Sequence, residues 1–315
     1  MLLYKKILSV KAVVVFSIFA SGILFLSYNA FSYDLFNYIF DAKIITEYGD
    51  NPYERKALDY PEDPSLGFMR WTHRVYPYGP VWLLMSVPLS YASMGSLLLN
   101  MILFKGIALF SYLGSVLLLK KIIEIIGLKR VGFHLGLFAL HPLVIVESLV
   151  SAHNDIVMMF FLIIALYLLV SRKYWFSLIP YGLSIGVKFA TAFLLPVFFY
   201  VMYKRGKITD WQPVITLSFI CMFFAVLAAS YRSDFLLQPW YLLYIFPFMA
   251  LSLRKSIIVP TLVVSLFAFF QYFPYIFFGH YDPPISFYMA LILSGSFILA
   301  AIFSTAVYFW STIKR

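Results

Sequence analysis

The chain consists of one apolar run after another, and most runs are about as long as a membrane-spanning helix. About 20 apolar residues in a helix cross roughly 30 Å of hydrocarbon, whereas the alternating strands of a membrane β-barrel are absent here. Hydrophobic residues make up 63% of the chain and charged residues only 12%. We therefore predict an all-α, polytopic transmembrane helical bundle that occupies residues 1–315 as a single domain. The ten expected spans are about 10–31, 97–119, 132–150, 155–170, 175–187, 189–203, 213–230, 240–253, 256–277 and 285–311.

The basic residues between these runs orient the chain. If it crosses the membrane ten times with both termini inside, sixteen of the 24 Lys and Arg residues fall on the inner side, and twelve of the fourteen acidic residues fall outside. This distribution follows the positive-inside rule, so we expect a multi-pass protein of the cell membrane with both termini in the cytoplasm. The net charge of +10 then serves orientation and contact with anionic membrane lipids, and we expect no nucleic-acid partner.

Two segments depart from simple spans. Tyr78 to Met94 is apolar enough to cross, but counting it would invert every later loop, and Pro80 and Pro88 interrupt it. We predict that it forms an interfacial or re-entrant helix within a first outer loop of residues 32–96. The short runs 175–187 and 189–203 are expected to form a broken helical pair that meets near Lys188, as helices that line a cavity do.

The first outer loop collects the most prominent candidate site residues. Asp34 stands a few residues beyond the first span, so the helix end should hold its carboxylate at a fixed depth just outside the bilayer. Farther along the loop come Asp41, Tyr53, Arg74 and Tyr78. The aromatic rings could serve as interfacial anchors, or they could stack on sugar rings beside the carboxylates.

The shorter outer turns add further polar residues. His153, Asn154 and Asp155 stand together between two spans, where Asn or Asp could simply cap a helix or could take part in a site. Arg232 and Trp240 lie on another turn of the same side, where an interfacial aromatic belt with an ion pair is the alternative reading.

Lys105 and Lys188 lie within apolar runs, where a charge is costly and by default functional. Snorkelling toward the headgroups is the alternative for either one. On the expected topology both lie in the outer half of the membrane, where they could hold a phosphate. Glu147, near the outer end of its span, could pair with one of them.

The sequence contains no specific metal or nucleotide motif. The five histidines are scattered, HExxH and CxxC are absent, and no glycine-rich phosphate loop precedes a helix. We therefore expect no cofactor and no nucleotide-sugar site. The inner loops are too short for a soluble catalytic domain, so the chemistry should occur at the outer face with a donor that comes through or within the membrane.

In motif order the chain resembles the GT-C superfamily of polytopic glycosyltransferases, and most closely the polyprenol-phosphate-mannose-dependent mannosyltransferases. The resemblance rests on an Asp after the first span, then Asn-Pro-Tyr and Tyr-Pro-Tyr-Gly-Pro, His-Asn-Asp, Gly-Val-Lys and Gln-Pro-Trp-Tyr. It implies that Asp34 is the catalytic residue and that Asp155 is a second acidic residue near it. Users of monophosphate-linked donors in this superfamily are generally metal-independent, whereas diphosphate-linked donors more often need a divalent cation.

The resemblance implies a hexosyltransferase that moves a hexose, mannose by analogy, from a polyprenyl-phosphate donor to a lipid- or glycan-linked acceptor at the outer face. Asp34 would act as the base in an inverting displacement, and Lys188, Lys105 or Arg232 would hold the leaving phosphate. The main alternative is a lipid or solute transporter or flippase, for which broken helices and intramembrane lysines are equally natural. A third interpretation is a membrane transferase that moves a group other than a sugar. A flippase would move the donor lipid without cleaving its glycosidic bond.

Overall fold

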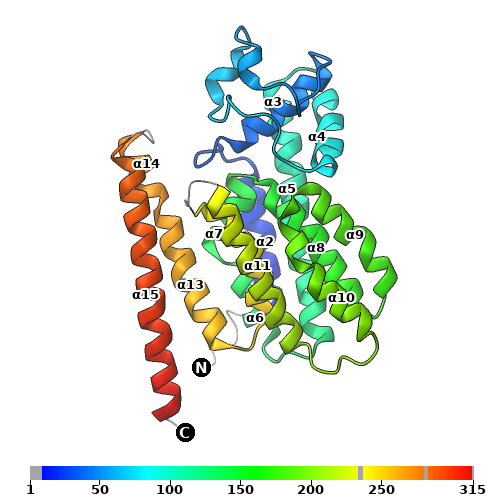
Figure 1. Cartoon of the computed structure of the whole chain (residues 1–315), viewed down its shortest axis with the longest axis vertical. Helices are drawn as coiled ribbons and strands as arrows, with labels where there is room; N and C mark the ends of the chain where they lie inside the picture. Colours follow the sequence, from blue (N-terminus) through cyan, green and yellow to red (C-terminus); the bar gives the residue numbers. More distant parts are fainter. Residues whose placement is uncertain (1–8, 233–236, 280–282, 314–315) are drawn as a thin grey trace.

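The structure is a computed structural model that describes residues 9–232, 237–279 and 283–313, and these residues form an all-α bundle (Figure 1). Its α-helices are α2 (Val10–Phe25), α3 (Asp34–Thr46), α4 (Pro80–Ala92), α5 (Leu97–Ile125), α6 (Val131–Ala139), α7 (Pro142–Ile145), α8 (Asn154–Val170), α9 (Tyr174–Val187), α10 (Leu195–Tyr203), α11 (Gln212–Arg232), α12 (Phe246–Leu251), α13 (Lys255–Phe270), α14 (Tyr272–Phe278) and α15 (Ile285–Ile313). Shorter 3-10 or π-helical segments are η1 (Ala57–Asp59), η2 (Pro64–Phe68), η3 (Val146–Val150), η4 (Phe189–Leu194) and η5 (Pro239–Tyr244).

Every apolar run predicted to span is helical, but not every helix is long enough to cross a membrane unaided. Four helical stretches in the described part of the chain pass that test by length and hydropathy: Leu97–Ile125, Gln212–Arg232, Lys255–Phe278 and Ile285–Phe303. A fifth is counted if Val131–Ala139 and Pro142–Val150, bent by 53° at their junction, form one span. These helices indicate a multi-pass membrane protein, whereas ten crossings remain a prediction.

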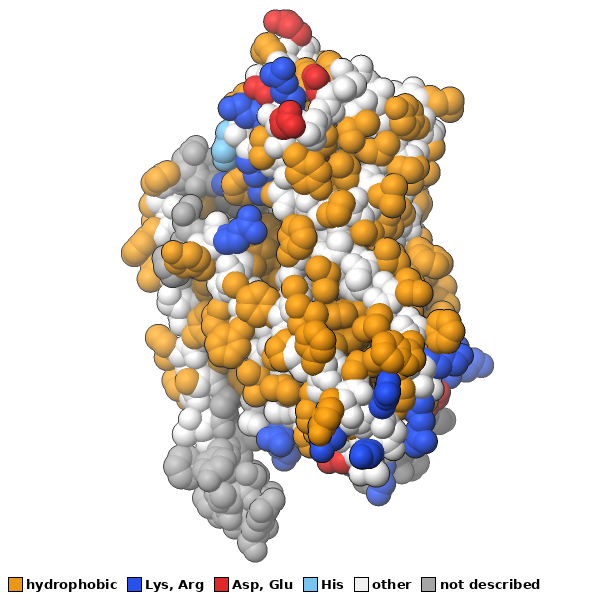
Figure 2. Space-filling view, turned by 45° about the vertical axis from the view of Figure 1, so that its right-hand side comes forward, with side chains coloured by type: hydrophobic (Ala, Val, Ile, Leu, Met, Phe, Trp, Pro, Cys, Tyr) orange, Lys and Arg blue, Asp and Glu red, His pale blue; other side chains and the backbone are white. Residues whose placement is uncertain are grey.

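Charge separates along the long axis of the molecule. In Figure 2 an orange hydrophobic band covers the middle, acidic side chains gather at the upper end and Lys and Arg crowd the lower end. The start of α2 and the end of α15 lie toward this lower end in Figure 1. The exposed basic residues of the connecting turns include Lys121, Lys129, Lys173, Arg205 and Lys255. On the predicted topology this lower end is the inner side, and the orientation itself stays a prediction.

The first outer loop forms a cap at the upper end, where α3 and α4 lie above the long helices (Figure 1). At 13 residues, α4 is shorter than the roughly 20 residues that cross a bilayer. It packs against α3 and against α9. The cap therefore rests directly on the end of the broken helical pair.

The break in that pair occurs where it was predicted. Lys188 is extended (φ −155°, ψ 129°) between the end of α9 and the start of η4. The Gly79 amide donates to the Val187 carbonyl at 3.1 Å. A Cβ atom on Gly79 would lie only 2.2 Å from the Gly186 carbonyl oxygen, so a side chain there would block the approach. The two glycines thus let Tyr78 and Lys188 lie side by side.

At the side of the bundle, α13 and α15 pack against each other as a long hairpin, with α14 near its top (Figure 1). The hairpin contacts the rest of the molecule through α7, α12 and η5. Since α14 and α15 also face the cap, they close one side of a large cavity described next.

Candidate active site

A cavity of about 650 Å³ opens at the upper end of the bundle, between the cap and the tops of the helices. Its walls come from segments far apart in the sequence: the start of α3, the cap, η4, the end of α11, η5, α14 and α15. The residues predicted from sequence that line it are Asp34, Arg74, Tyr78, Lys188, Arg232 and Trp240. Its volume falls within the range of roughly 300–1,000 Å³ that is typical of small-molecule sites.

Asp34 is the first residue of α3 and is buried, with one edge on the cavity. A carboxylate in the first helical turn is favoured by the helix dipole. The backbone N–H of Asp34 donates to Ser32 Oγ at 3.1 Å, and Trp71 Nε1 donates to Asp34 Oδ1 at 3.0 Å. The first bond fixes the backbone of Asp34, and the second holds its carboxylate from one side before any substrate arrives.

His153 lies behind Asp34 and is flanked by a second carboxylate. Its Nδ1 is 3.5 Å from Asp34 Oδ2, and its Nε2 is 3.3 Å from Glu147 Oε2. Neither ring nitrogen makes a hydrogen bond of ordinary geometry within the described residues, so these contacts are chiefly electrostatic. The Trp240 ring stacks on the imidazole, with centroids 4.2 Å apart and planes 21° apart. A cavity-wall aromatic thus covers the buried histidine.

These contacts set the charge of both groups. Burial alone would lower the pKa of His153, but the contacts with Asp34 and Glu147 raise it to about 9. Burial alone would raise the pKa of Asp34, but the contact with His153 and the charges of Arg74 and Lys188 leave it below its ordinary value. Near neutral pH, Asp34 is therefore an ionised carboxylate beside an imidazolium.

Lys188 presents the other charge of the cavity. Its Nζ donates to Asp155 Oδ1 at 2.7 Å, and the Asp155 side chain is fully buried while that of Lys188 remains 20% exposed. The ammonium also lies 5.7, 5.5 and 5.9 Å from the ring centroids of Tyr78, Tyr241 and Tyr244. Cation–π attraction and the ion pair hold the ammonium at the cavity wall.

Asn154 and Asp155 do not act as side-chain caps of α8, which was the alternative reading of this turn. No side-chain cap hydrogen bond is formed at the start of α8. Asp155 holds Lys188, and Asn154 Oδ1 accepts a hydrogen bond from Tyr38 Oη at 3.3 Å, which ties α8 to α3.

Six predicted site residues do not line the cavity: His153, Asn154 and Asp155, described above, and Tyr53, Asp41 and Lys105. Tyr53 stacks edge-on against Tyr76 in the cap, with ring centroids 5.0 Å apart. Asp41 is buried about two turns farther along α3, where burial raises its pKa to about 7. Lys105 Nζ donates to the carbonyls of Leu24, at 3.2 Å, and Ser27, at 2.5 Å.

The last contact also explains why the first helix is shorter than the predicted 10–31. The chain leaves helical geometry after Phe25, and the ammonium of Lys105 donates to the Leu24 and Ser27 carbonyls at this end. A basic side chain is favoured at a helix C-terminus, where unpaired carbonyls carry partial negative charge.

The expected pairing of Glu147 with a lysine is wrong. Glu147 lies in the π-helical segment η3, and the chain turns back through Ala152, whose φ of 50° is left-handed. The His153 N–H donates to the Glu147 carbonyl at 3.0 Å in this turn. The turn thereby brings the Glu147 and His153 side chains together, away from both lysines. π-helical turns are frequent at functional sites.

Sequence reasoning missed Trp71, Tyr241, Tyr244 and Tyr272 as neighbours of the charged groups. Tyr272 Oη donates to Glu147 Oε1 at 2.8 Å across 125 positions of sequence. Nothing in the local sequence distinguishes these rings from interfacial aromatics. Glu147 was recognisable as a charge in an apolar run, although its partner was not.

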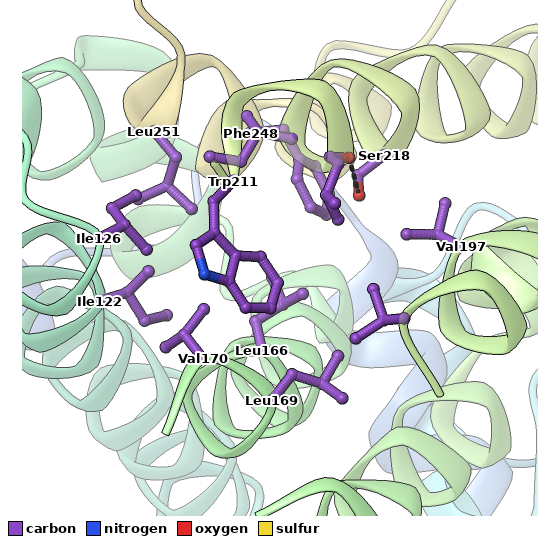
Figure 3. Close-up of a pocket in the computed structure, with 13 residues that line it drawn as sticks. Ile122, Ile126, Leu166, Leu169, Val170, Val197, Trp211, Ser218, Phe248 and Leu251 are labelled. Atoms are coloured by element: carbon purple, nitrogen blue, oxygen red, sulfur yellow. Dashed lines mark hydrogen bonds between the residues drawn. The ribbon is translucent and has the colours of Figure 1, made fainter. Parts of the chain in front are cut away.

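A second hollow, far smaller, surrounds Trp211 toward the opposite end of α5 (Figure 3). It measures about 20 Å³ and is walled by aliphatic side chains such as Ile122, Leu166 and Leu251. The Ser218 hydroxyl, its polar neighbour in Figure 3, donates to the Val214 carbonyl of its own helix at 2.8 Å. Such a space holds about one water molecule and no sugar.

Comparison with known protein families identifies a family for this chain. Residues 10–204 match the family model of the alpha-(1->6)-mannopyranosyltransferase N-terminal domain. The matched segment includes Asp34, His153 and Lys188. No curated protein matches the chain. No solved structure matches it either. Because the match covers more than half of its length, the chain belongs to the alpha-(1->6)-mannopyranosyltransferase family of the GT-C superfamily and is a hexosyltransferase.

Proposed function

We propose that this protein transfers mannose from a polyprenyl-phosphate-mannose donor to a hydroxyl of a lipid- or glycan-linked acceptor at the outer face of the membrane. The observation that carries the proposal is the ionised carboxylate of Asp34 at the edge of a 650 Å³ cavity that also presents the Lys188 ammonium. A base and a phosphate-binding cation are the two charges that this reaction requires.

In the proposed step, the acceptor oxygen attacks C1 of mannose from the face opposite the phosphate. Its proton passes to Asp34, the bond between C1 and the phosphate oxygen breaks, and the configuration at C1 inverts. The bonding electrons leave with the polyprenyl phosphate, so the leaving group gains negative charge. Lys188, with Arg74 and Arg232 on the cavity wall, stabilises that charge. An alpha-(1->6) linkage would make the acceptor hydroxyl O6 of a hexose.

The cavity also supports the proposal that residues 1–315 act as one domain. Asp34, His153 and Lys188 lie in the segment that matches the family, whereas Arg232, Trp240 and Tyr272 follow it in sequence. The second group closes the cavity walls around the first. The proposed mannosyl transfer therefore needs both the matched segment 10–204 and the residues that follow it.

The direct test is transfer of radiolabelled mannose from a synthetic polyprenyl-phosphate-mannose by purified protein in detergent, with a hexose-bearing lipid as acceptor. Asp34→Asn keeps the shape of the side chain but removes the base, so kcat should fall by roughly 10²–10⁴-fold while the variant still binds donor lipid. A wild-type protein that moves the lipid across vesicles without forming a new glycoside would be a flippase. Full turnover by Asp34→Asn would reject Asp34 as the base.

We further propose that the cap lies outside the cell and both termini inside. Cysteines at Glu62 in the cap and at Lys129 in a basic turn, both exposed positions, should report this in a Cys221→Ser background. An impermeant maleimide should label Glu62→Cys on intact cells and Lys129→Cys only after permeabilisation. Labelling of both from outside would mean that the segment containing α4 crosses the membrane.

A further inference from the structure

Glu147 is a buried acidic residue that has no role in the reaction steps proposed above. Its side chain is fully inaccessible to solvent and does not line the cavity, so it cannot meet the substrate there. Its Oε1 accepts the Tyr272 hydroxyl at 2.8 Å, and its Oε2 lies 3.3 Å from His153 Nε2. Burying a carboxylate costs several kcal/mol unless it is well paired, so an isolated structural role is a poor explanation.

The surroundings of His153 show what Glu147 acts on. From α3, Asp34 Oδ2 faces one ring nitrogen, and from η3, Glu147 faces the other. From η5, the Trp240 ring covers the imidazole face, and from α14, Tyr272 reaches Glu147. The imidazole therefore lies in a row of three ionisable groups, with a carboxyl group at each end.

We infer that Glu147 is a positioning residue for mannosyl transfer, which acts through His153 to hold a buried cation against the carboxylate of Asp34. The inference rests on the function proposed above. Trp71 holds Oδ1 through a hydrogen bond and the His153 imidazolium attracts Oδ2, so both contacts oppose rotation of the Asp34 carboxylate away from the cavity. Preorganised charge of this kind costs no rearrangement when the proton transfers.

The role of Glu147 determines how the reaction depends on pH. In the wild type, His153 should stay protonated up to a pH of about 9, because carboxylates flank both of its ring nitrogens. Glu147→Gln keeps the size of the side chain but removes one of those carboxylates. His153 should then lose its proton at lower pH, and Asp34, deprived of the cation, should bind its own proton more readily. The two limbs of the pH profile should move toward each other.

The decisive experiment measures kcat/KM against pH, from 5 to 10, for the wild type and for Glu147→Gln with the polyprenyl-phosphate-mannose donor. The alkaline limb of Glu147→Gln should lie roughly 1–3 pH units lower, the usual effect of one opposite charge at this range. Tyr272→Phe, which removes only the donor to Glu147, should shift it less. Glu124→Gln is the matched control: Glu124 is exposed and pairs with Lys120 at 3.4 Å, so its profile should equal that of the wild type.

A Glu147→Gln profile that is merely lower in amplitude, with unchanged limbs, would overturn the inference while leaving the proposed function intact. A wild-type protein that transfers no mannose would instead overturn the proposed function. If Glu147→Gln does not fold, NMR titration of ¹⁵N-histidine-labelled wild-type protein decides the matter, with His153 assigned from a His153→Gln spectrum. A His153 signal that titrates near its ordinary value of about 6.5 would refute the buried cation.

Discussion

Two lysines occupy apolar helices in this protein, and their surroundings differ in what they offer a ligand. Lys188 faces a 650 Å³ cavity, is held by one buried carboxylate and lies among three tyrosine rings. Lys105 is enclosed in helix α5 and donates to backbone carbonyls at the end of α2. The Lys188 ammonium thus has room for an anion. The Lys105 ammonium, by contrast, already donates hydrogen bonds to backbone carbonyls of the protein itself.

The difference shows how the partners of a charged residue in an apolar run indicate whether that residue binds a ligand. Desolvation makes both ammonium groups costly, so both need partners, and each sequence context is equally unusual. A partner that is a neutral carbonyl at a helix end accounts for the lysine completely. A partner that leaves the charge exposed at a cavity wall does not account for the lysine completely. At such a position we expect a ligand.

Of the two lysine substitutions, Lys188→Met should have the larger effect on kcat/KM for the donor. A charge-assisted hydrogen bond is worth about 1.5–3 kcal/mol, so Lys188→Met should lower kcat/KM for the donor by roughly 10- to 150-fold. The single change also leaves Asp155 buried without its cation. The double variant Lys188→Met/Asp155→Asn removes both charges and should retain the fold while showing the same kinetic loss. Normal donor kinetics in the double variant would remove Lys188 from the phosphate site.

A smaller effect, of another kind, is expected for Lys105. Lys105→Met leaves the Leu24 and Ser27 carbonyls without their donor, which should cost about 1–3 kcal/mol of stability and lower the Tm. The folded variant should keep the wild-type KM for the donor, measured in the same transfer assay. A KM that rises as much as in the Lys188 variant, at normal Tm, would show that the two regions are alike after all.

The smallest effect on turnover should come from Asp41, a predicted site residue that lies about two turns beyond Asp34 on α3. Asp41 does not line the cavity, and its raised pKa of about 7 means that ionising it is unfavourable in the folded protein. Asp41→Asn should therefore turn over close to the wild-type rate. Its carboxyl pKa is raised above the unfolded value, so the penalty grows as pH rises to about 7. The gain in Tm from the substitution should be larger at pH 8 than at pH 5. An inactive Asp41→Asn beside an active Asp34→Asn would move the base to Asp41.

Local sequence was enough to predict where helices form and where one of them breaks. Apolar runs at 155–170 and 213–230 correspond to α8 and α11 within a few residues, because burial in a membrane or a bundle requires a continuous helical backbone. The Gly186-Val187-Lys188 break was equally visible, since a charge and a glycine interrupt an apolar pattern. The family resemblance and the choice of Asp34, a few residues beyond the first predicted span, followed from the same local signals.

Local sequence could not predict which buried charges meet. Glu147 might have faced either lysine, and the π-helical turn at η3 with left-handed Ala152 turned it toward His153 instead. Helix rotation by one residue changes the facing side by about 100°, so partners across helices depend on packing rather than on spacing.

The sequence by itself determined the class of the protein, its helices, the segregation of its charges and the membership in a mannosyltransferase family. These follow from hydropathy, from charge between apolar runs and from short motifs, all of which act over neighbouring residues. Only the tertiary structure decided that Lys188 faces a cavity while Lys105 caps a helix, and that Tyr272 reaches Glu147 from the far end of the chain. Those contacts join residues separated by up to 125 positions, and they exist because the α13–α15 hairpin and the cap close over the bundle.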